Sequence, residues 1–281
     1  MRLLVIGYGY SAQSVHRALT DKLEGLVVTT RTPDKQQALA NDGLRAVVFD
    51  ATQPSDALSA ELEDATHLLI SAAPDEGGDP FLRHHNLSAA NRLRGVAYLS
   101  TVGVYGNHDG AWVDETTTLQ PESRRSVLRL EAEAAWEKIC SVKDIPLSSH
   151  RLSGIYGPER NPLVRVLNGQ ARRIIKPGQV FNRIHVADIG RVVAAALLAE
   201  YNGPLNVTDD MPAPPQDVLE HAASLLGTAP PPAVDFETAD LTPMARSFYG
   251  ENKRVSNALS KRLFGSYLYP DYKAGLASLL D

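Results

Sequence analysis

Residues near the start of the chain have the types and the spacing of a dinucleotide-binding turn. An apolar run, Leu3 to Ile6, is followed by glycines and an alanine in the pattern Gly-x-Gly-x-x-Ala. In such a turn the first glycine allows a tight bend, the second lets a pyrophosphate approach the backbone, and the small third residue lets a helix pack closely on the strand. The helix start would then hold the phosphates, and the alternative is a tight turn without a ligand. The residues predicted to contact the cofactor here are Gly7, Gly9, Tyr10, Ser11 and Ala12.

The end of the second predicted strand bears on which cofactor is bound. An NAD-binding protein usually places an Asp or Glu there, which accepts hydrogen bonds from the adenosine ribose. This chain has Thr30, Arg31 and Thr32 instead, with Lys35 close behind. Arg31 and the two hydroxyls could bind the 2′-phosphate of NADP, whereas the alternative is a solvated arginine at a strand end. The sequence therefore favours NADP(H) over NAD(H).

Two further strand ends are expected beside the same cofactor. Asp50 and Ala51 end the third predicted strand and could face the adenine. Ala72 and Ala73 follow the fourth strand and are expected near the middle of the cofactor. Both expectations depend on a parallel sheet, in which the carboxyl ends of the strands meet at one edge.

The elements that would position these residues alternate regularly in the first half of the chain. This alternation predicts a Rossmann-like, doubly wound α/β fold with a parallel sheet covered by helices on both faces. The predicted strands are Leu3 to Ile6, Leu26 to Thr29, Ala46 to Phe49, His67 to Ile70, Val96 to Leu99 and Pro146 to Arg151. The predicted helices are Ala12 to Leu19, Pro33 to Asn41, Arg124 to Cys140 and Val186 to Glu200.

Proline-rich turns interrupt the second half, which predicts a smaller and more irregular substrate-binding region. We expect an NAD(P)-binding domain made of residues 1–155 and about 180–203. The substrate region would comprise about 156–179 and 204–281. The two domains would thus interleave along the chain.

Composition narrows the possible partners. The net charge of −5 provides no basic stripe for a phosphate backbone, so nucleic acid is not expected as a partner. The single cysteine excludes an intrachain disulfide and a cysteine-based metal cluster, and we expect no metal. Neither a signal peptide nor an apolar run of about 20 residues is present, so we expect no membrane contact and a cytoplasmic location.

Three later segments have the look of family motifs. They are Leu99-Ser-Thr-Val-Gly-Val-Tyr-Gly106, Arg151-Leu-Ser-Gly-Ile-Tyr-Gly-Pro158 and Arg183-Ile-His-Val-Ala-Asp188. Together with the glycine turn, they resemble motifs of the extended and atypical short-chain dehydrogenase/reductases, the NAD-dependent epimerase/dehydratase-like proteins. The resemblance covers residues 3 to 190, in the order of that family.

The resemblance implies that Thr101 orients the oxygen of the substrate. It also implies a Tyr-x-x-x-Lys pair, one helical turn apart, as the acid/base of the reaction. In a gapless alignment these positions fall on Arg125 and Arg129, and no tyrosine lies between Tyr105 and Tyr156. Arginine stays protonated and cannot exchange a proton as a phenol does. Arg129 could still contact the ribose, and Arg125 could bind an anionic substrate group or remain a surface charge.

Several other residues are candidates for proton transfer or for contacts with the cofactor and the substrate. Tyr156 is expected at the edge of the cofactor, and Tyr105 beside the substrate. His185 has the titration range of a general acid or base, and in the family this residue mostly packs and forms hydrogen bonds. Arg160 and Arg183 could reach phosphates of a substrate or lie at the rim as ordinary charges. The loop acids Asp75, Glu76 and Asp79 could donate a proton or form a solvated turn.

Two functions remain open at this point. The first is an NADP(H)-dependent oxidoreductase or epimerase-like enzyme that acts on a small carbonyl, imine or sugar-type substrate. The second is a catalytically inactive NADP(H) sensor or structural module, because a fold does not fix a function. We expect a monomer or a homodimer, since the helix from Arg124 to Cys140 pairs subunits in many relatives.

Overall fold

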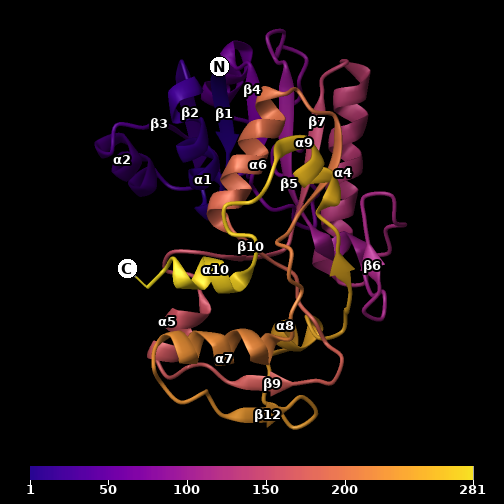
Figure 1. The fold of residues 1–281 in the computed structure, drawn as a ribbon. Helices are drawn as coiled ribbons and strands as arrows, with labels where there is room; N and C mark the ends of the chain where they lie inside the picture. The colour runs from indigo at the N-terminus through magenta and orange to yellow at the C-terminus, as the bar shows by residue number, and fades with distance from the viewer. Residues whose placement is uncertain (281) are drawn as a thin grey trace. The chain divides into compact units, whose positions relative to one another are not determined.

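The computed structural model describes residues 1–280, which divide into two compact units (Figure 1). Unit 1 comprises Met1–Thr101, Arg124–Arg151 and Ile189–Leu205. Unit 2 comprises Val102–Ser123, Leu152–Asp188 and residues 206–280. Each unit is therefore built from separate stretches of the chain.

A seven-stranded sheet forms the centre of unit 1, with the strand order β11-β7-β5-β4-β1-β2-β3. The adjacent pairs from β3 to β5 are parallel, and Val5 lies opposite both Val28 of β2 and Leu69 of β4. The strands are β1 Arg2–Ile6, β2 Gly25–Thr30, β3 Arg45–Val48, β4 His67–Ile70, β5 Gly95–Thr101, β7 Leu147–Leu152 and β11 Gly203–Val207. This arrangement confirms the predicted Rossmann-like α/β fold.

The middle strands are apolar because both faces of the sheet are covered. Every residue of β4 is buried, as are Leu3 to Ile6 of β1. On one face Leu4, Leu68 and Tyr98 pack in the same cluster as Trp136. The helices associated with unit 1 are α1 Tyr10–Leu19, α2 Pro33–Asn41, α3 Asp56–Asp64, α4 Arg124–Val142 and α6 Val186–Leu198, and a 3-10 turn, η1 Thr20–Lys22, follows α1.

Local sequence explains where several of these helices begin and how closely they pack. The Thr32 hydroxyl accepts a hydrogen bond from the Lys35 amide at the start of α2, and Pro33 occupies the first turn. Ser55 caps α3 in the same way through the Leu58 amide. Gly190 lets α6 approach α1, because a Cβ at this position would lie 2.5 Å from the Ser14 carbonyl oxygen.

Unit 2 contains three two-stranded parallel pairs and short helices. The pairs are β6 Trp112–Val113 with β13 Arg254–Val255, β8 Gly154–Tyr156 with β10 Arg183–His185, and β9 Arg173–Ile175 with β12 Ala233–Asp235. The helices are η2 Val102–Tyr105, α5 Pro162–Leu167, α7 Pro215–Leu225, α8 Pro243–Ser247, α9 Ala258–Phe264 and α10 Tyr272–Ala277. Pro162, Pro215 and Pro243 lie in first helical turns, where a missing amide hydrogen costs little.

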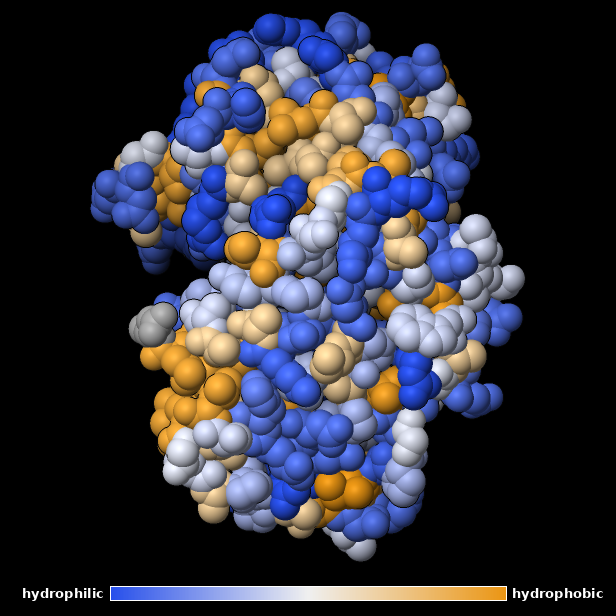
Figure 2. All heavy atoms as spheres, in the orientation of Figure 1, coloured by the Kyte–Doolittle hydropathy of each residue, from blue (hydrophilic) through white to orange (hydrophobic). Residues whose placement is uncertain are grey.

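The surface is mostly hydrophilic on the face shown in Figure 2. Within residues 1–280, no helix combines the length and the apolar character that a membrane crossing requires.

Candidate functional site

The glycine turn after β1 has a backbone that only glycine adopts easily. Gly7 has a φ of +89°, and a Cβ there would lie 2.8 Å from the amide nitrogen of Ala72. The Gly7 amide donates to the Thr29 hydroxyl over 2.8 Å, which ties the turn to the end of β2. Gly9 differs, because its φ of −102° is ordinary and a Cβ would meet no atom within 4 Å. The space beside Gly9 is therefore open, which is what a pyrophosphate needs.

The start of α1 suits an anion. The first backbone hydrogen bond of the helix runs from the Gln13 amide to the Gly9 carbonyl over 2.9 Å, so the amides of Ser11 and Ala12 precede it. No acidic residue lies in the first turn, and the Gly9 cap supplies no side chain to bind these amides. Ala12 is fully buried, which lets α1 lie close to the sheet. The residues present thus fit a dinucleotide phosphate group.

The end of β2 presents one buried hydroxyl and one exposed guanidinium. Thr30 is buried and Arg31 is exposed. Among residues 1–280, Arg31 makes no hydrogen bond or ion pair, so its donors are available to a ligand. The Thr32 hydroxyl accepts from the Lys35 amide as the cap of α2, which leaves its own proton free to donate. Both Arg31 and Thr32 can therefore donate hydrogen bonds to an anion, and Arg31 adds a positive charge.

The predicted residues after β3 and β4 have defined local roles. The Asp50 carboxylate accepts from the amide and hydroxyl of Thr52, and these bonds lower its pKa. Ala51 has a φ of +64°, and its carbonyl accepts from His84 Nε2 over 2.7 Å. The Ala72 amide donates to Ile6, whereas Ala73 is exposed. Ala72 thus lines the glycine turn directly.

The carboxyl end of β5 carries Thr101, and Arg129 of α4 lies against it. Thr101 is the last residue of β5 and is half-buried, and the buried hydroxyl of Ser100 has no hydrogen-bond partner in the described chain. Arg129 of α4 donates from Nη1 to the Leu99 carbonyl over 2.7 Å, and its guanidinium lies 5.6 Å from the centre of the Tyr98 ring. Arg125, one turn earlier, is exposed. The structure thus places Arg129 against the end of β5.

Both candidate tyrosines of unit 2 use their hydroxyl groups within the protein. Tyr105 Oη donates to Asn206 Oδ1 over 2.7 Å in the interior. Tyr156 Oη donates to the Asp271 carbonyl over 3.3 Å, and burial raises the pKa of this phenol well above its usual value. A Cβ at Gly275 would lie 1.9 Å from Tyr156 Oη, so α10 closes over this ring. The Tyr156 phenol therefore keeps its proton near neutral pH.

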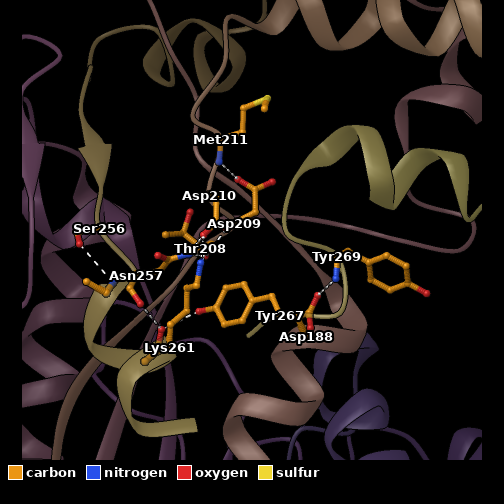
Figure 3. A network of polar contacts seen from close by, with 12 residues as sticks. Asp188, Thr208, Asp209, Asp210, Met211, Ser256, Asn257, Lys261, Tyr267 and Tyr269 are labelled. Atoms are coloured by element: carbon orange, nitrogen blue, oxygen red, sulfur yellow. Dashed lines mark hydrogen bonds and ion pairs between the residues drawn. The ribbon is translucent and has the colours of Figure 1, made fainter. Parts of the chain in front are cut away.

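His185 is an uncharged, packed histidine. It is 3% exposed, and burial lowers its pKa to about 4. Its Nδ1 accepts from the Ala187 amide over 3.2 Å, and its ring lies 4.1 Å from that of Tyr269 and 5.2 Å from that of Tyr156, centre to centre. Asp188 fixes the neighbouring segment, because its carboxylate accepts from the amides of Leu268 and Tyr269. Figure 3 shows the bond to Tyr269.

A buried acid, Asp209, was not predicted from the sequence. It is 1% exposed, and Oδ1 accepts from the Met211 amide, as Figure 3 shows. Its Oδ2 has no hydrogen-bond partner within the described residues. Burial raises the pKa of Asp209 to about 7, and the positive charge of Arg183 opposes this rise. This carboxyl can therefore exchange a proton near neutral pH.

Arg183 lies in the same part of unit 2 as Asp209. Its Nη1 donates to the carbonyls of Phe181 and Ala213, and its guanidinium lies 5.9 Å from the centre of the Tyr272 ring. The Asp209 amide also donates to the Arg183 carbonyl over 2.7 Å. Arg160, by contrast, is exposed. The structure thus brings Arg183, Asp209, Tyr156 and His185 into unit 2, and the glycine turn, Arg31 and Ala72 into unit 1.

The loop acids after β4 serve the structure of unit 1. Asp79 is not in a solvated turn, since it is 5% exposed and accepts from the amides of Phe81 and Leu82 and from Trp136 Nε1 over 3.0 Å. Asp75 pairs with Arg83 and Glu76 with Arg124. In the part of the chain that the structure describes, no three His, Cys, Asp or Glu side chains are grouped to hold a metal.

Comparisons with known proteins agree with this geometry. Residues 3–78 match the TrkA-N domain, so the chain carries a Rossmann NAD(P)-binding domain. A putative NAD-dependent epimerase/dehydratase from Methylobacillus flagellatus has a similar structure, with 25% identity, a TM-score of 0.72 and coverage of 99% of this chain and 97% of that one.

A second solved structure shows the family. It is a functionally unknown conserved protein from Silicibacter pomeroyi DSS, 48% identical, with a TM-score of 0.87 and coverage of 99% of this chain and 97% of that one. The chain belongs to the family of this conserved protein. A 3-diazoavenalumate denitrifying reductase from Streptomyces sp is 34% identical over 108 residues, so the match spans 36% of this chain and 36% of that reductase.

Proposed function

We propose that the protein is an NADP(H)-dependent oxidoreductase that reduces a small carbonyl, imine or sugar-type substrate. The observation that carries the proposal is the glycine turn, which leaves open space at Gly9 beside the start of a helix without acidic residues. The unpaired Arg31 at the end of β2 supports the phosphorylated cofactor. When bound, the cofactor supplies or accepts a hydride.

The residues of the chain would have distinct roles in such a reaction. Gly7, Gly9 and the start of α1 would bind the pyrophosphate, and Arg31 the 2′-phosphate. Thr101 would hold the reacting oxygen or nitrogen of the substrate. Arg129, anchored on Leu99, would present its remaining donors near the end of β5. Reduction of an activated C=N bond would suit a site without the tyrosine, because it demands little proton transfer.

Arg183 of unit 2 would bind an anionic group of the substrate. The partial match to a protein named as a reductase supports reduction as the reaction class.

The second candidate function is an NADP(H) sensor or structural module without turnover. It is favoured by the arginines at both positions of the family's acid/base pair, because neither can act as a phenol does. A sensor would distinguish oxidised from reduced cofactor without consuming it.

The experiment that tests the proposal is a titration with NADPH, NADH, NADP and NAD, followed by calorimetry or tryptophan fluorescence. Saturable binding that favours the phosphorylated pair is expected, followed by NADPH oxidation in a screen of carbonyl and imine compounds. Binding without turnover across that screen would favour the sensor, and absence of binding by all four cofactors would refute both functions.

A further inference from the structure

A pocket on unit 1 lies apart from the glycine turn and has no role in the proposed reaction. Its volume is about 390 Å³, which is within the range of small-molecule sites. The wall on one side is α4, and the other side is formed by β7 and the start of β11. All the lining residues belong to unit 1, so the pocket is complete within that unit.

The sequence explains why this space is not filled. Ser149 and Arg151 alternate on β7 and share one face, while Glu133 and Glu137 are one turn apart on α4. Ser149 is small, and the adjacent β11 begins with Gly203, which has no side chain. Apolar side chains that would close the space between α4 and β11 are missing at these positions.

A buried ion pair lines the pocket and balances its own charge. Arg151 Nη2 lies 3.0 Å from Glu133 Oε2, and the two side chains are only 6% and 8% exposed. Removing each charge alone from water would be costly, so each of the two buried charges needs the other as its partner. Glu133 and Arg151 therefore leave the pocket without net charge.

Glu137 adds a negative charge that nothing balances. Its side chain is exposed and makes no hydrogen bond or ion pair with any residue that the structure describes. Ser149 provides the second feature, since the residue is only 7% exposed and lines the pocket, yet its hydroxyl has no hydrogen-bond partner in residues 1–280. The pocket thus offers a carboxylate and a hydroxyl, both able to accept hydrogen bonds.

We propose that this pocket binds a small organic cation, with an ammonium or guanidinium group held between Glu137 and Ser149. The cation would form an ion pair with the Glu137 carboxylate and donate a hydrogen bond to Ser149 Oγ. A metal ion fits less well, because no three ligating side chains are grouped within the described chain. The nearby Cys140 takes no covalent part, since burial raises its pKa to about 12 and keeps the thiol protonated.

The test uses the full chain and measures the binding of butylamine, 1,4-diaminobutane and agmatine by calorimetry. 1-Butanol serves as the uncharged probe of similar size. We expect saturable binding of at least one amine, weakened about 10-fold by Glu137→Gln and several-fold by Ser149→Ala. The matched control is Glu131→Gln, which removes the same charge from an exposed position of α4 outside the pocket and should leave binding unchanged.

Three results would overturn the proposal. They are absence of saturable binding by every amine, equal binding of 1-butanol, and equal loss of binding in Glu131→Gln and Glu137→Gln. Both variants change exposed residues and are expected to fold normally. An NADPH titration of Glu137→Gln should match that of the wild type. Failure of the cation site is therefore distinguishable from failure of the proposed reductase function.

Discussion

Arg129 donates a hydrogen bond to the carbonyl oxygen of Leu99, two residues before Thr101. This bond joins α4 to the strand that carries the proposed substrate-orienting threonine. Residue 129 therefore holds a cation that is fixed by the backbone of the sheet. An arginine here stabilises the end of β5, whatever it also does for a ligand.

Removal of this guanidinium should cost stability. Arg129→Met leaves the Leu99 carbonyl without its donor, so we expect the free energy of unfolding to fall by about 1–3 kcal/mol. Urea denaturation followed by circular dichroism measures the change. Lys138→Met removes an exposed charge from the same helix and should change stability by less than about 0.5 kcal/mol. Equal effects of the two variants would contradict the role assigned to Arg129.

The two glycines of the turn should respond differently to alanine. Gly7→Ala places a Cβ against Ala72 at a positive φ, so unfolding should become easier by about 2 kcal/mol or more. Gly9→Ala meets no protein atom, so stability should stay within about 0.5 kcal/mol of the wild type. The same Gly9 variant should bind NADPH about 10-fold or more weakly, because its methyl group occupies the proposed phosphate space. Unchanged NADPH affinity in stable Gly9→Ala would place the cofactor elsewhere.

Arg31 should determine the preference for the phosphorylated cofactor. Loss of a charge-assisted bond in Arg31→Ala should raise the dissociation constant for NADPH by about 10- to 100-fold and leave that for NADH nearly unchanged. Calorimetric titration of both cofactors measures the ratio. The control, Arg94→Ala, removes the same charge just before β5, at the amino-terminal ends of the parallel strands. If Arg31→Ala weakens the binding of NADPH and NADH equally, Arg31 does not bind the 2′-phosphate.

Asp209 should make stability depend on pH in a predictable direction. Its folded-state pKa is raised from 3.8 to about 7, so the native state holds an extra proton between these values. The stability it contributes is therefore complete below about pH 4 and is lost as the pH rises through about 7. Asp209→Asn should remove this loss, so that the difference in unfolding free energy from the wild type grows in favour of the variant between pH 4 and pH 8. A difference that is independent of pH would show that Asp209 titrates normally.

Periodicity and turn chemistry predicted most of unit 1. The strands from β1 to β5, together with β7, were predicted within a few residues of their observed ends. Helix α3, strand β11 and the short turn η1 were missed. Helix α3 is mostly polar with few buried positions, and β11 begins with Gly203 and Pro204, which look like a turn. Only its place in the sheet beside β7 makes that segment a strand.

The site could be predicted only in part, because burial decides the chemistry of its acids. The glycine turn is a local pattern, so the sequence alone reveals it. Asp79 looked like a loop acid, yet it lies against Trp136, 57 residues away in the chain. Asp209 follows the strand that was missed, so nothing in the sequence indicated that its carboxyl would be buried. Long-range packing fixed both environments.

The division of the chain has a consequence for its synthesis. Unit 1 includes residues as late as Leu205, and unit 2 includes residues as early as Val102. During translation the first hundred residues therefore emerge without β7 and the edge strand β11, and with one side of β5 unpaired. An open strand edge can pair with another chain. A ribosome-bound fragment that ends near residue 140 should therefore depend on chaperones more than one that ends after residue 230.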